Sequence, residues 1–214
     1  MKTDIRPAGP DDTEFLAWVM LTAARSHLHY GIWEHFVGGT EQDCLAFLNL
    51  VATTQRPHLF HYSVFLVAER NGQKMGALSG YDPSHMGMNS FTQSIPGVFQ
   101  KLGWSRNQQK AAFERYLPWM TCAPDNSEGA WIVESVAVRP EYRRQGIIIA
   151  LLDEVLETGK KGGYTLAQIG VLINNTPARL AYEKQGFKFD SEKRNPEFEA
   201  IFGTPGITKL LLDL

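Results

Sequence analysis

The sequence contains little of what several protein classes depend on. Its 214 residues include two cysteines, Cys44 and Cys122, too few for a disulfide framework or a cysteine-based zinc site. The formal net charge of −2 mixes both signs and leaves no basic field for nucleic acid. No apolar run is long enough to span a membrane, and the opening MKTDIRPAGPDD lacks the apolar core of a signal peptide. We therefore expect a cytoplasmic protein without nucleic-acid or membrane partners.

The length fits one sizeable hydrophobic core. The 214 residues contain no internal repeat and no low-complexity tract that would mark a linker. We therefore expect a single domain over residues 1–214.

The most informative stretch is residues 131–152, WIVESVAVRPEYRRQGIIIALL. It starts with an apolar run broken by one acid and one serine, which predicts a buried strand that Pro140 ends. Arg143, Arg144 and Gly146 follow, and apolar residues then recur at helical spacing. A basic turn that opens a helix offers free backbone N–H groups and guanidiniums to phosphate oxygens. The stretch therefore predicts a pyrophosphate site.

Two common phosphate-binding motifs do not fit this turn. A P-loop needs a lysine followed by serine or threonine, and a dinucleotide fingerprint needs three spaced glycines, whereas the turn has only Gly146. The turn resembles instead the acyl-CoA loop of the GNAT superfamily of N-acetyltransferases, Arg/Gln-x-x-Gly-x-Gly/Ala. Arg143, Gly146 and Ile148 fall on its three positions. Ile148 departs from the pattern, because the family prefers a small residue where the backbone approaches the pyrophosphate.

A second motif supports the same resemblance. Residues 174–187, NNTPARLAYEKQGF, are similar to the family's Asn-x-x-Ala-x-x-Leu-Tyr-x-x-x-Gly-Phe. The matching residues are Asn175, Ala178, Tyr182, Gly186 and Phe187. Local physics agrees with a helix, because threonine can cap the start, proline fits the first turn and glycine can end it. With both motifs in the family's order, the chain is identified as a GNAT member.

The resemblance implies an α/β (α+β) fold. In the GNAT fold a mixed, mostly antiparallel twisted sheet of six to seven strands is flanked by helices. The patterns agree with strands at 62–70, 73–81, 131–138 and 164–173 and with helices at 12–27 and 41–52. Asn71-Gly72 predicts a two-residue hairpin turn, and the proline- and glycine-bearing stretch 193–206 predicts a loop.

Residues 82–129 are the least family-like part of the chain. They replace a short connection between the third and fourth strands, and a helical run over 106–120 predicts one or two helices packed over the sheet. We expect this insertion to act as an acceptor-site lid or to be a structural or dimerisation appendage.

The chemistry implied by the resemblance places two residues at the reacting groups. An amine with a pKa near ~10.4 is almost entirely protonated at pH 7, so a base is useful. Glu134 is the charged residue inside the buried strand and matches the family's base position, although a buried ion pair would also explain it. Tyr182 matches the family's usual acid for the thiolate. Because a phenol near ~10 is a weaker acid than a thiol near ~8.5, we expect a hydrogen bond rather than full proton transfer.

The resemblance also assigns binding residues. Those implied for the CoA moiety are Val136, Ala137, Val138, Arg143, Arg144, Gln145, Gly146, Ile147, Ile148, Ile149, Asn175 and Ala178. The acceptor pocket would include Glu134 and, from the aromatic- and histidine-rich stretch SHLHYGIWEHF, His29, Tyr30 and Trp33. An alternative for that stretch is that its aromatic residues fill the core.

Together these features predict an N-acetyltransferase with acetyl-CoA as co-substrate and no metal. The acceptor would be a small-molecule or peptide primary amine, and a homodimer is compatible with the fold. The alternative is an acyl-CoA-binding sensor or regulatory domain without turnover, which Ile148 and the insertion favour.

Overall fold

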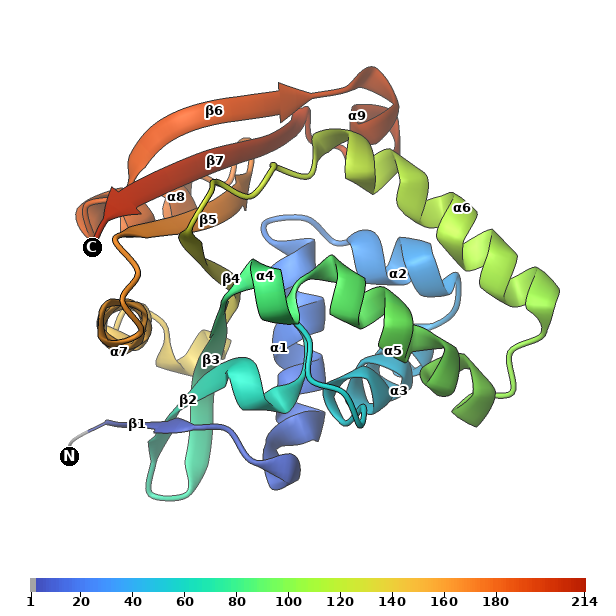
Figure 1. The fold of residues 1–214 in the computed structure, drawn as a ribbon, viewed down its shortest axis with the longest axis horizontal. Coiled ribbons are helices and arrows are strands. Elements are labelled where there is room, and N and C mark those ends of the chain that lie inside the picture. Colours follow the sequence, from blue (N-terminus) through green and yellow to red (C-terminus); the bar gives the residue numbers. More distant parts are fainter. Residues whose placement is uncertain (1–2) are drawn as a thin grey trace.

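The computed structural model describes residues 3–214, and a seven-stranded sheet organises them (Figure 1). The strand order is β1-β2-β3-β4-β5-β7-β6, in which β4 and β5 run parallel and every other neighbouring pair is antiparallel. This is the mixed, mostly antiparallel sheet that the family resemblance implies. The strands are β1 (Asp4–Pro7), β2 (Phe65–Arg70), β3 (Gln73–Tyr81), β4 (Ala130–Val138), β5 (Leu166–Leu172), β6 (Lys188–Arg194) and β7 (Gly206–Asp213).

Helices cover both faces of the sheet. None of those in the described range is long and apolar enough to cross a membrane. The helices are α1 (Thr13–Arg25), α2 (Ile32–Val37), α3 (Glu41–Ala52), α4 (Pro83–Met86), α5 (Met88–Lys101), α6 (Arg106–Cys122), α7 (Ile147–Lys161), α8 (Thr176–Lys184) and α9 (Pro196–Phe202), with short 3₁₀ turns η1 (Pro10–Asp12), η2 (Tyr62–Val64) and η3 (Pro140–Tyr142).

The β2–β3 hairpin forms as its turn residues predict. Asn71 and Gly72 have φ of 52° and 75°, so both central positions are left-handed, as a twisted two-residue turn requires. The turn sets the register of β2 with β3, and β3 pairs with β4 along its other edge.

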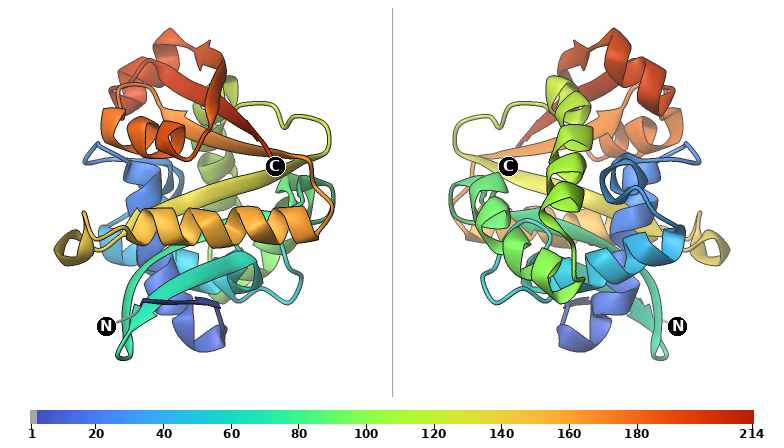
Figure 2. Two further views of the ribbon diagram at one scale, coloured as in Figure 1. Left: turned by 90° about the vertical axis from the view of Figure 1, so that its left-hand side faces the viewer. Right: turned by 90° about the vertical axis from the view of Figure 1, so that its right-hand side faces the viewer.

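Two separate hydrophobic clusters lie on the two sides of the sheet. We call the side covered by α1, α2, α3, α5 and α6 the helical face, and the opposite side, covered by α7 and α8, the α7 face. Figure 2 shows α7 crossing the sheet in one view and α6 in front of it in the opposite view. The sheet therefore separates two environments.

A β-bulge in β4 determines which of its residues face which side. Ala77 pairs with Ala137 and Ser79 pairs with Glu134, so two steps along β3 correspond to three along β4. The extra residue lies at Ser135, whose φ of 53° is left-handed. Because side chains alternate along a strand, one extra residue reverses the facing of all that follow.

The parallel pairing of β4 with β5 ends early. It runs from Ala130 opposite Leu166 to Val133 opposite Ile169. Beyond this point β4 stays paired with β3, while β5 stays paired with β7, so the two halves of the sheet diverge (Figure 1). The divergence starts at Glu134 and leaves the backbone of 134–138 unpaired on its β5 side.

Three sequence predictions need correction. The stretch 193–206 is not all loop: Asn195 caps α9, Pro196 occupies its first turn and Gly203 ends it with a φ of 71°. Proline and glycine here mark the start and end of a helix rather than a loop. The histidine- and aromatic-rich stretch contains α2, which was not predicted. The insertion contains three helices rather than one or two, and α6 continues through Pro118 to Cys122.

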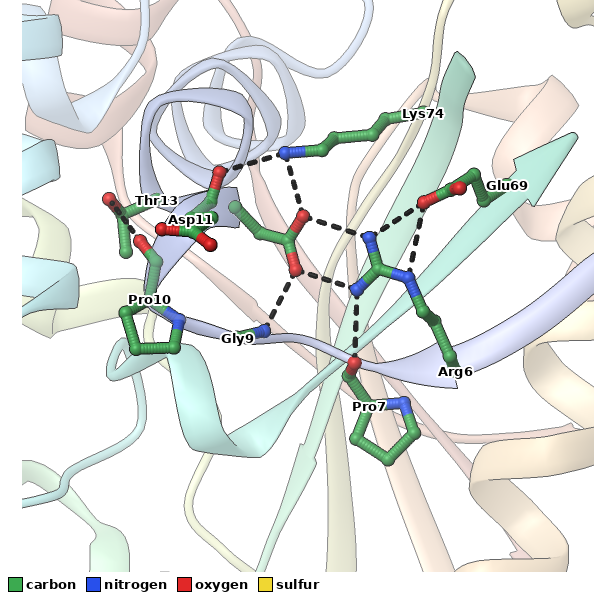
Figure 3. Close-up of polar contacts among 9 residues, drawn as sticks. Arg6, Pro7, Gly9, Pro10, Asp11, Thr13, Glu69 and Lys74 are labelled. Carbon is green, nitrogen blue, oxygen red and sulfur yellow. Dashed lines mark hydrogen bonds and ion pairs between the residues drawn. The ribbon is translucent and has the colours of Figure 1, made fainter. Parts of the chain in front are cut away.

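A charged cluster fastens β1 to the hairpin (Figure 3). The Arg6 guanidinium donates to Asp12 at 2.7 and 3.0 Å and to Glu69 at 2.7 and 3.1 Å. Lys74 pairs with Asp12 at 2.7 Å and donates to the Asp11 carbonyl at 2.9 Å. Burial alone would raise the pKa of Asp12, but donation from Arg6, the Gly9 N–H and Lys74 holds it well below the usual range.

Candidate functional site

Glu134 lies where β4 leaves β5, with its carboxylate toward the helical face. The Tyr81 hydroxyl donates to Glu134 Oε2 at 2.9 Å, and the Ser79 hydroxyl donates to the Glu134 carbonyl at 3.1 Å. Burial raises the pKa of Glu134 to about 7, against the opposing effect of the Tyr81 hydrogen bond. A carboxylate with a pKa near neutral is well matched to accepting a proton at pH 7.

The insertion also reaches this carboxylate. Tyr116 of α6 lies near it. Burial raises the pKa of the Tyr116 phenol most, and the nearby charge of Glu134 raises it further. The Tyr116 hydroxyl contacts the Met88 sulfur of α5 at 3.8 Å. The ion-pair partner that would explain a buried Glu134 is not found among residues 3–214; the hydrogen bond comes from Tyr81 instead.

Sequence reasoning missed both tyrosines. Tyr81 could have been found from the hairpin that Asn71-Gly72 predicts. It ends the second strand of that hairpin, which pairs with β4, and it lies two residues from Ser79 on the same face. Tyr116 could not, because its approach to Glu134 depends on how the insertion folds back over the sheet.

Tyr182 lies on the other side of the sheet from Glu134. It is 6% exposed within the α7-face cluster, next to Phe187 and one helical turn from Ala178. Burial raises the pKa of its phenol, which keeps the hydroxyl protonated. The two candidate catalytic groups therefore flank the diverging strands from opposite faces.

The basic turn forms as a strand–turn–helix unit. Arg144 and Gly146 are left-handed, with φ of 61° and 75°, and α7 starts directly after Gly146. Arg143, Arg144 and Gln145 are exposed, and no side chain caps the helix. Arg143 Nε donates to the Val138 carbonyl at 3.2 Å, which ties the turn to the end of β4. The turn can offer backbone N–H groups and guanidiniums to an anion.

The three isoleucines after the turn are buried or half-buried against neighbouring residues. Ile147 is buried at 3% exposure, and Ile148 packs against the α7-face cluster. Ile149 is half-buried, and its carbonyl accepts from Gln185 Nε2 at 3.2 Å. The branched side chain that departs from the family pattern thus contributes to the core.

The remaining residues predicted for the CoA moiety lie along the divergence. Ala137 and Val138 pair with β3, and Val136 packs on the α7-face cluster. Asn175 caps α8 by accepting from the Ala178 N–H at 3.3 Å, a position the sequence assigned to Thr176. The Asn175 amide also donates to the Ser26 hydroxyl and so joins α8 to the end of α1.

The residues predicted for the acceptor are not brought together. His29 and Tyr30 are exposed, and the Tyr30 hydroxyl contacts His35 Nδ1 at 3.1 Å. Trp33 is 5% exposed and packs against three phenylalanines, as expected if the aromatic residues fill the core. No contact joins any of the three to Glu134 within the described part of the chain.

Two cavities lie away from Glu134. One, of about 440 Å³, lies between α3 and α6 and includes Arg115 in its lining. The other, of about 240 Å³, lies between β5, β6 and the start of α8. Glu134 lines neither cavity.

The sequence model described as the acetyltransferase (GNAT) family matches residues 34–187, more than half of the chain. This match defines an acyltransferase. The chain belongs to the GNAT family of acetyltransferases.

Solved structures agree on the fold. A crystal structure described as an acetyltransferase has a TM-score of 0.71 and 20% identity, with 98% of each chain covered. An N-acetyltransferase from Staphylococcus aureus Mu50 has a TM-score of 0.71 and 16% identity, covering 98% of this chain and 100% of its own. The PaiA N-acetyltransferase from Thermoplasma acidophilum, in complex with coenzyme A, has a TM-score of 0.55 and 14% identity over 100% of both chains. No curated protein sequence matches this chain.

Proposed function

We propose that this chain transfers an acetyl group from acetyl-CoA to a primary amine, with Glu134 as general base. The observation that supports the proposal best is the place of Glu134. It is a carboxylate with a pKa near 7 and no cationic partner among residues 3–214, at the point where β4 leaves β5. A group at that point with that basicity can take a proton from an ammonium or an attacking amine.

The residues present fit acetyl-CoA. The unpaired edge of 134–138 offers backbone donors and acceptors to an extended pantetheine arm, much as an added strand would pair. Gly146 and the exposed Arg143 and Arg144 at the start of α7 suit the pyrophosphate. Acetyl-CoA would supply the acyl group as an activated thioester. Asn175 and Ala178, at the start of α8, would border the same arm.

The two flanking groups have complementary roles in this proposal. As the amine nitrogen bonds to the acetyl carbon and the carbon–sulfur bond breaks, Glu134 accepts the proton that the nitrogen loses. Tyr182, kept protonated by burial, donates a hydrogen bond to the sulfur as it gains charge. The backbone N–H groups beside the bulge at Ser135 would polarise the thioester carbonyl.

The insertion would control access of the acceptor. Residues 82–129 place α5 and α6 over the helical face, and Tyr116 lies near the base. We propose that this segment is the acceptor-site lid of a single domain and that an acceptor enters when it moves. His29, Tyr30 and the rim of α2 would then border the entrance, while Trp33 supports it from the core.

The test is release of free thiol from acetyl-CoA with a panel of primary amines. Glu134→Gln should lower amine-dependent release about 10²- to 10⁴-fold at pH 7 and less at high pH, where the free amine needs no base. Glu128→Gln, the same change at an exposed acid just before β4, should leave release unchanged. Equal release by wild type and Glu134→Gln would remove Glu134 from the mechanism. No release with any amine, while acetyl-CoA raises the melting temperature, would favour a sensor domain.

A further inference from the structure

Two tyrosines from different parts of the chain lie near Glu134. Tyr81 belongs to β3, is 4% exposed and donates to Oε2 at 2.9 Å. Tyr116 belongs to the insertion and lies near the same carboxylate. Among the described residues, these are the titratable groups that act on Glu134; α1, which also packs against β4, brings no ion pair to it.

Tyr81 has one available role toward the carboxylate. Burial and the charge of Glu134 raise the pKa of its phenol far above the ordinary value, so the hydroxyl keeps its proton and can only donate. Its bond occupies Oε2 and leaves Oε1 to receive a proton. A hydrogen bond to the charged form also favours that form, so Tyr81 increases the fraction of Glu134 that is ionised.

Tyr116 has the opposite influence. Its hydroxyl is directed to the Met88 sulfur, a weak acceptor, and no hydrogen bond joins it to Glu134 in the described chain. Its ring packs with α5 residues on the helical-face cluster, and burial of the carboxylate on this face disfavours its charged form. Thus one tyrosine favours ionisation and the other opposes it.

We infer that Tyr81 and Tyr116 are positioning residues for Glu134: Tyr81 fixes one carboxylate oxygen, and Tyr116 carries the insertion against the same carboxylate. This inference rests on the proposed function, because it assigns roles around its base. It gives the insertion a second role besides access. Closing α5 and α6 over the site changes the basicity of Glu134, so the pH at which the enzyme works depends on the insertion.

The experiment is the pH dependence of kcat/KM for amine acetylation in wild type and variants. Tyr81→Phe keeps the ring and removes the donor, so the acidic midpoint should move up by about one pH unit, with about tenfold lower activity on the acidic limb. Tyr116→Ala lets water reach the carboxylate, so the midpoint should move down by a comparable amount. Tyr116→Leu, which keeps apolar packing, should give a smaller shift in the same direction and serves where alanine prevents folding.

Matched controls separate position from general damage. Tyr164→Phe removes another tyrosine–carboxylate bond, the 2.8 Å contact with Asp82, and should leave the midpoint unchanged. Leu117→Ala truncates a 64% exposed side chain of α6 beside Tyr116 and should do the same. Equal loss of activity at every pH, unmoved midpoints, or shifts of both tyrosine variants in one direction would overturn the inference.

A readout without turnover keeps the inference distinct from the proposed function. Infrared difference spectra of the protonated carboxyl band, with Glu134→Gln as blank, give the midpoint of Glu134 directly. Wild type that never releases thiol would refute the proposed function, yet opposite shifts of this band in the two variants would still support the roles of Tyr81 and Tyr116. Absence of those shifts would refute the inference even in an active enzyme.

Discussion

The two faces of the sheet have different chemistry. The cluster on the α7 face is aliphatic, and its buried aromatic residues are Tyr182 and Phe187. The cluster on the helical face is built largely from aromatic rings. Its buried aromatic residues are Phe15, Trp33, Phe36, Phe47, Phe65, Tyr81, Phe91, Phe99, Phe198 and Phe202.

The polar groups follow the same division. Glu134 and the buried histidines His58 and His61 lie on the helical face, where each has a hydrogen-bond partner. The α7 face instead carries the start of α7 and the apolar residues that pack around Tyr182. The difference teaches that one face is packed mainly with aliphatic side chains, while the other carries Glu134 and buried histidines, whose charge can change with pH.

The largest effect should come from breaking the aromatic packing of the helical face. Phe99 is 1% exposed and packs against Phe36, Phe47, Trp104 and Phe113. Phe99→Ala should lower the free energy of unfolding by about 3–5 kcal/mol, because it removes a buried ring and leaves a cavity. Urea denaturation followed by tryptophan fluorescence measures the change.

The control for this prediction lies on the same cluster. Phe113 is 42% exposed, and Phe113→Ala should cost less than about 1.5 kcal/mol, since much of the ring is already in water. Equal costs for the two substitutions would show that the helical face is held together by something other than its buried rings.

The next effect is a loss of stability in mild acid that originates on the helical face. His58 is fully buried, with Nδ1 accepting from the Phe60 N–H at 3.1 Å and Nε2 contacting the Thr54 hydroxyl at 2.9 Å. A proton added to Nδ1 would face that N–H. Burial, followed by the neighbouring charge of His61, lowers the pKa of His58 to about 4.

The sign of this effect follows from the unfolded chain. An exposed imidazole has a pKa near ~6.5. Below that pH the His58 imidazole of the unfolded state is protonated, whereas that of the folded state stays neutral. The contribution is complete above pH 6.5, and about 3 kcal/mol should be lost as the pH falls to 4. Wild type and His58→Gln are compared by urea denaturation across this range, with the exposed His85→Gln as control. Parallel pH profiles for wild type and His58→Gln would contradict the assignment.

The smallest of these effects concerns the charged cluster at the edge of the sheet. The Asp12 side chain is 4% exposed, whereas those of Arg6 and Lys74 are 34% and 28% exposed and can turn to water. Asp12→Asn should therefore cost only about 1–2 kcal/mol, less than a pair buried on both sides. Asp11→Asn, an exposed neighbour, should cost almost nothing. Thermal denaturation of both variants measures the difference, and a larger loss for Asp11 would contradict this account.

Sequence patterns predicted those turns, helices and strands that are specified by residues close together in the chain. Asn71-Gly72 specifies its own turn, and α3 forms over residues 41–52 with Thr40 as its cap. The strand from Trp131 and the turn at Gly146 were predicted for the same reason. The family resemblance supplied the mixed, mostly antiparallel character of the sheet, which no local signal contains.

The parts that were missed depend on tertiary contacts or on ambiguous residues. Pro196 and Gly203 fit a loop or a capped helix equally well until the cap at Asn195 is known. Glu134 was predicted within a buried strand, but the nearness of Tyr116 depends on how the insertion folds back over the sheet. A tryptophan such as Trp33 suits either a pocket or a core, and only its packing in the folded chain shows that it lies in the core.

The two buried cysteines are internal probes of local opening. Cys44 in α3 and Cys122 at the end of α6 are both fully buried on the helical face, and burial raises the pKa of the Cys44 thiol to about 12. Thiol-specific reagents therefore react with coenzyme A long before they react with the folded chain. Because Cys122 belongs to the insertion and Cys44 does not, the ratio of their labelling rates compares local opening of the insertion with local opening of α3.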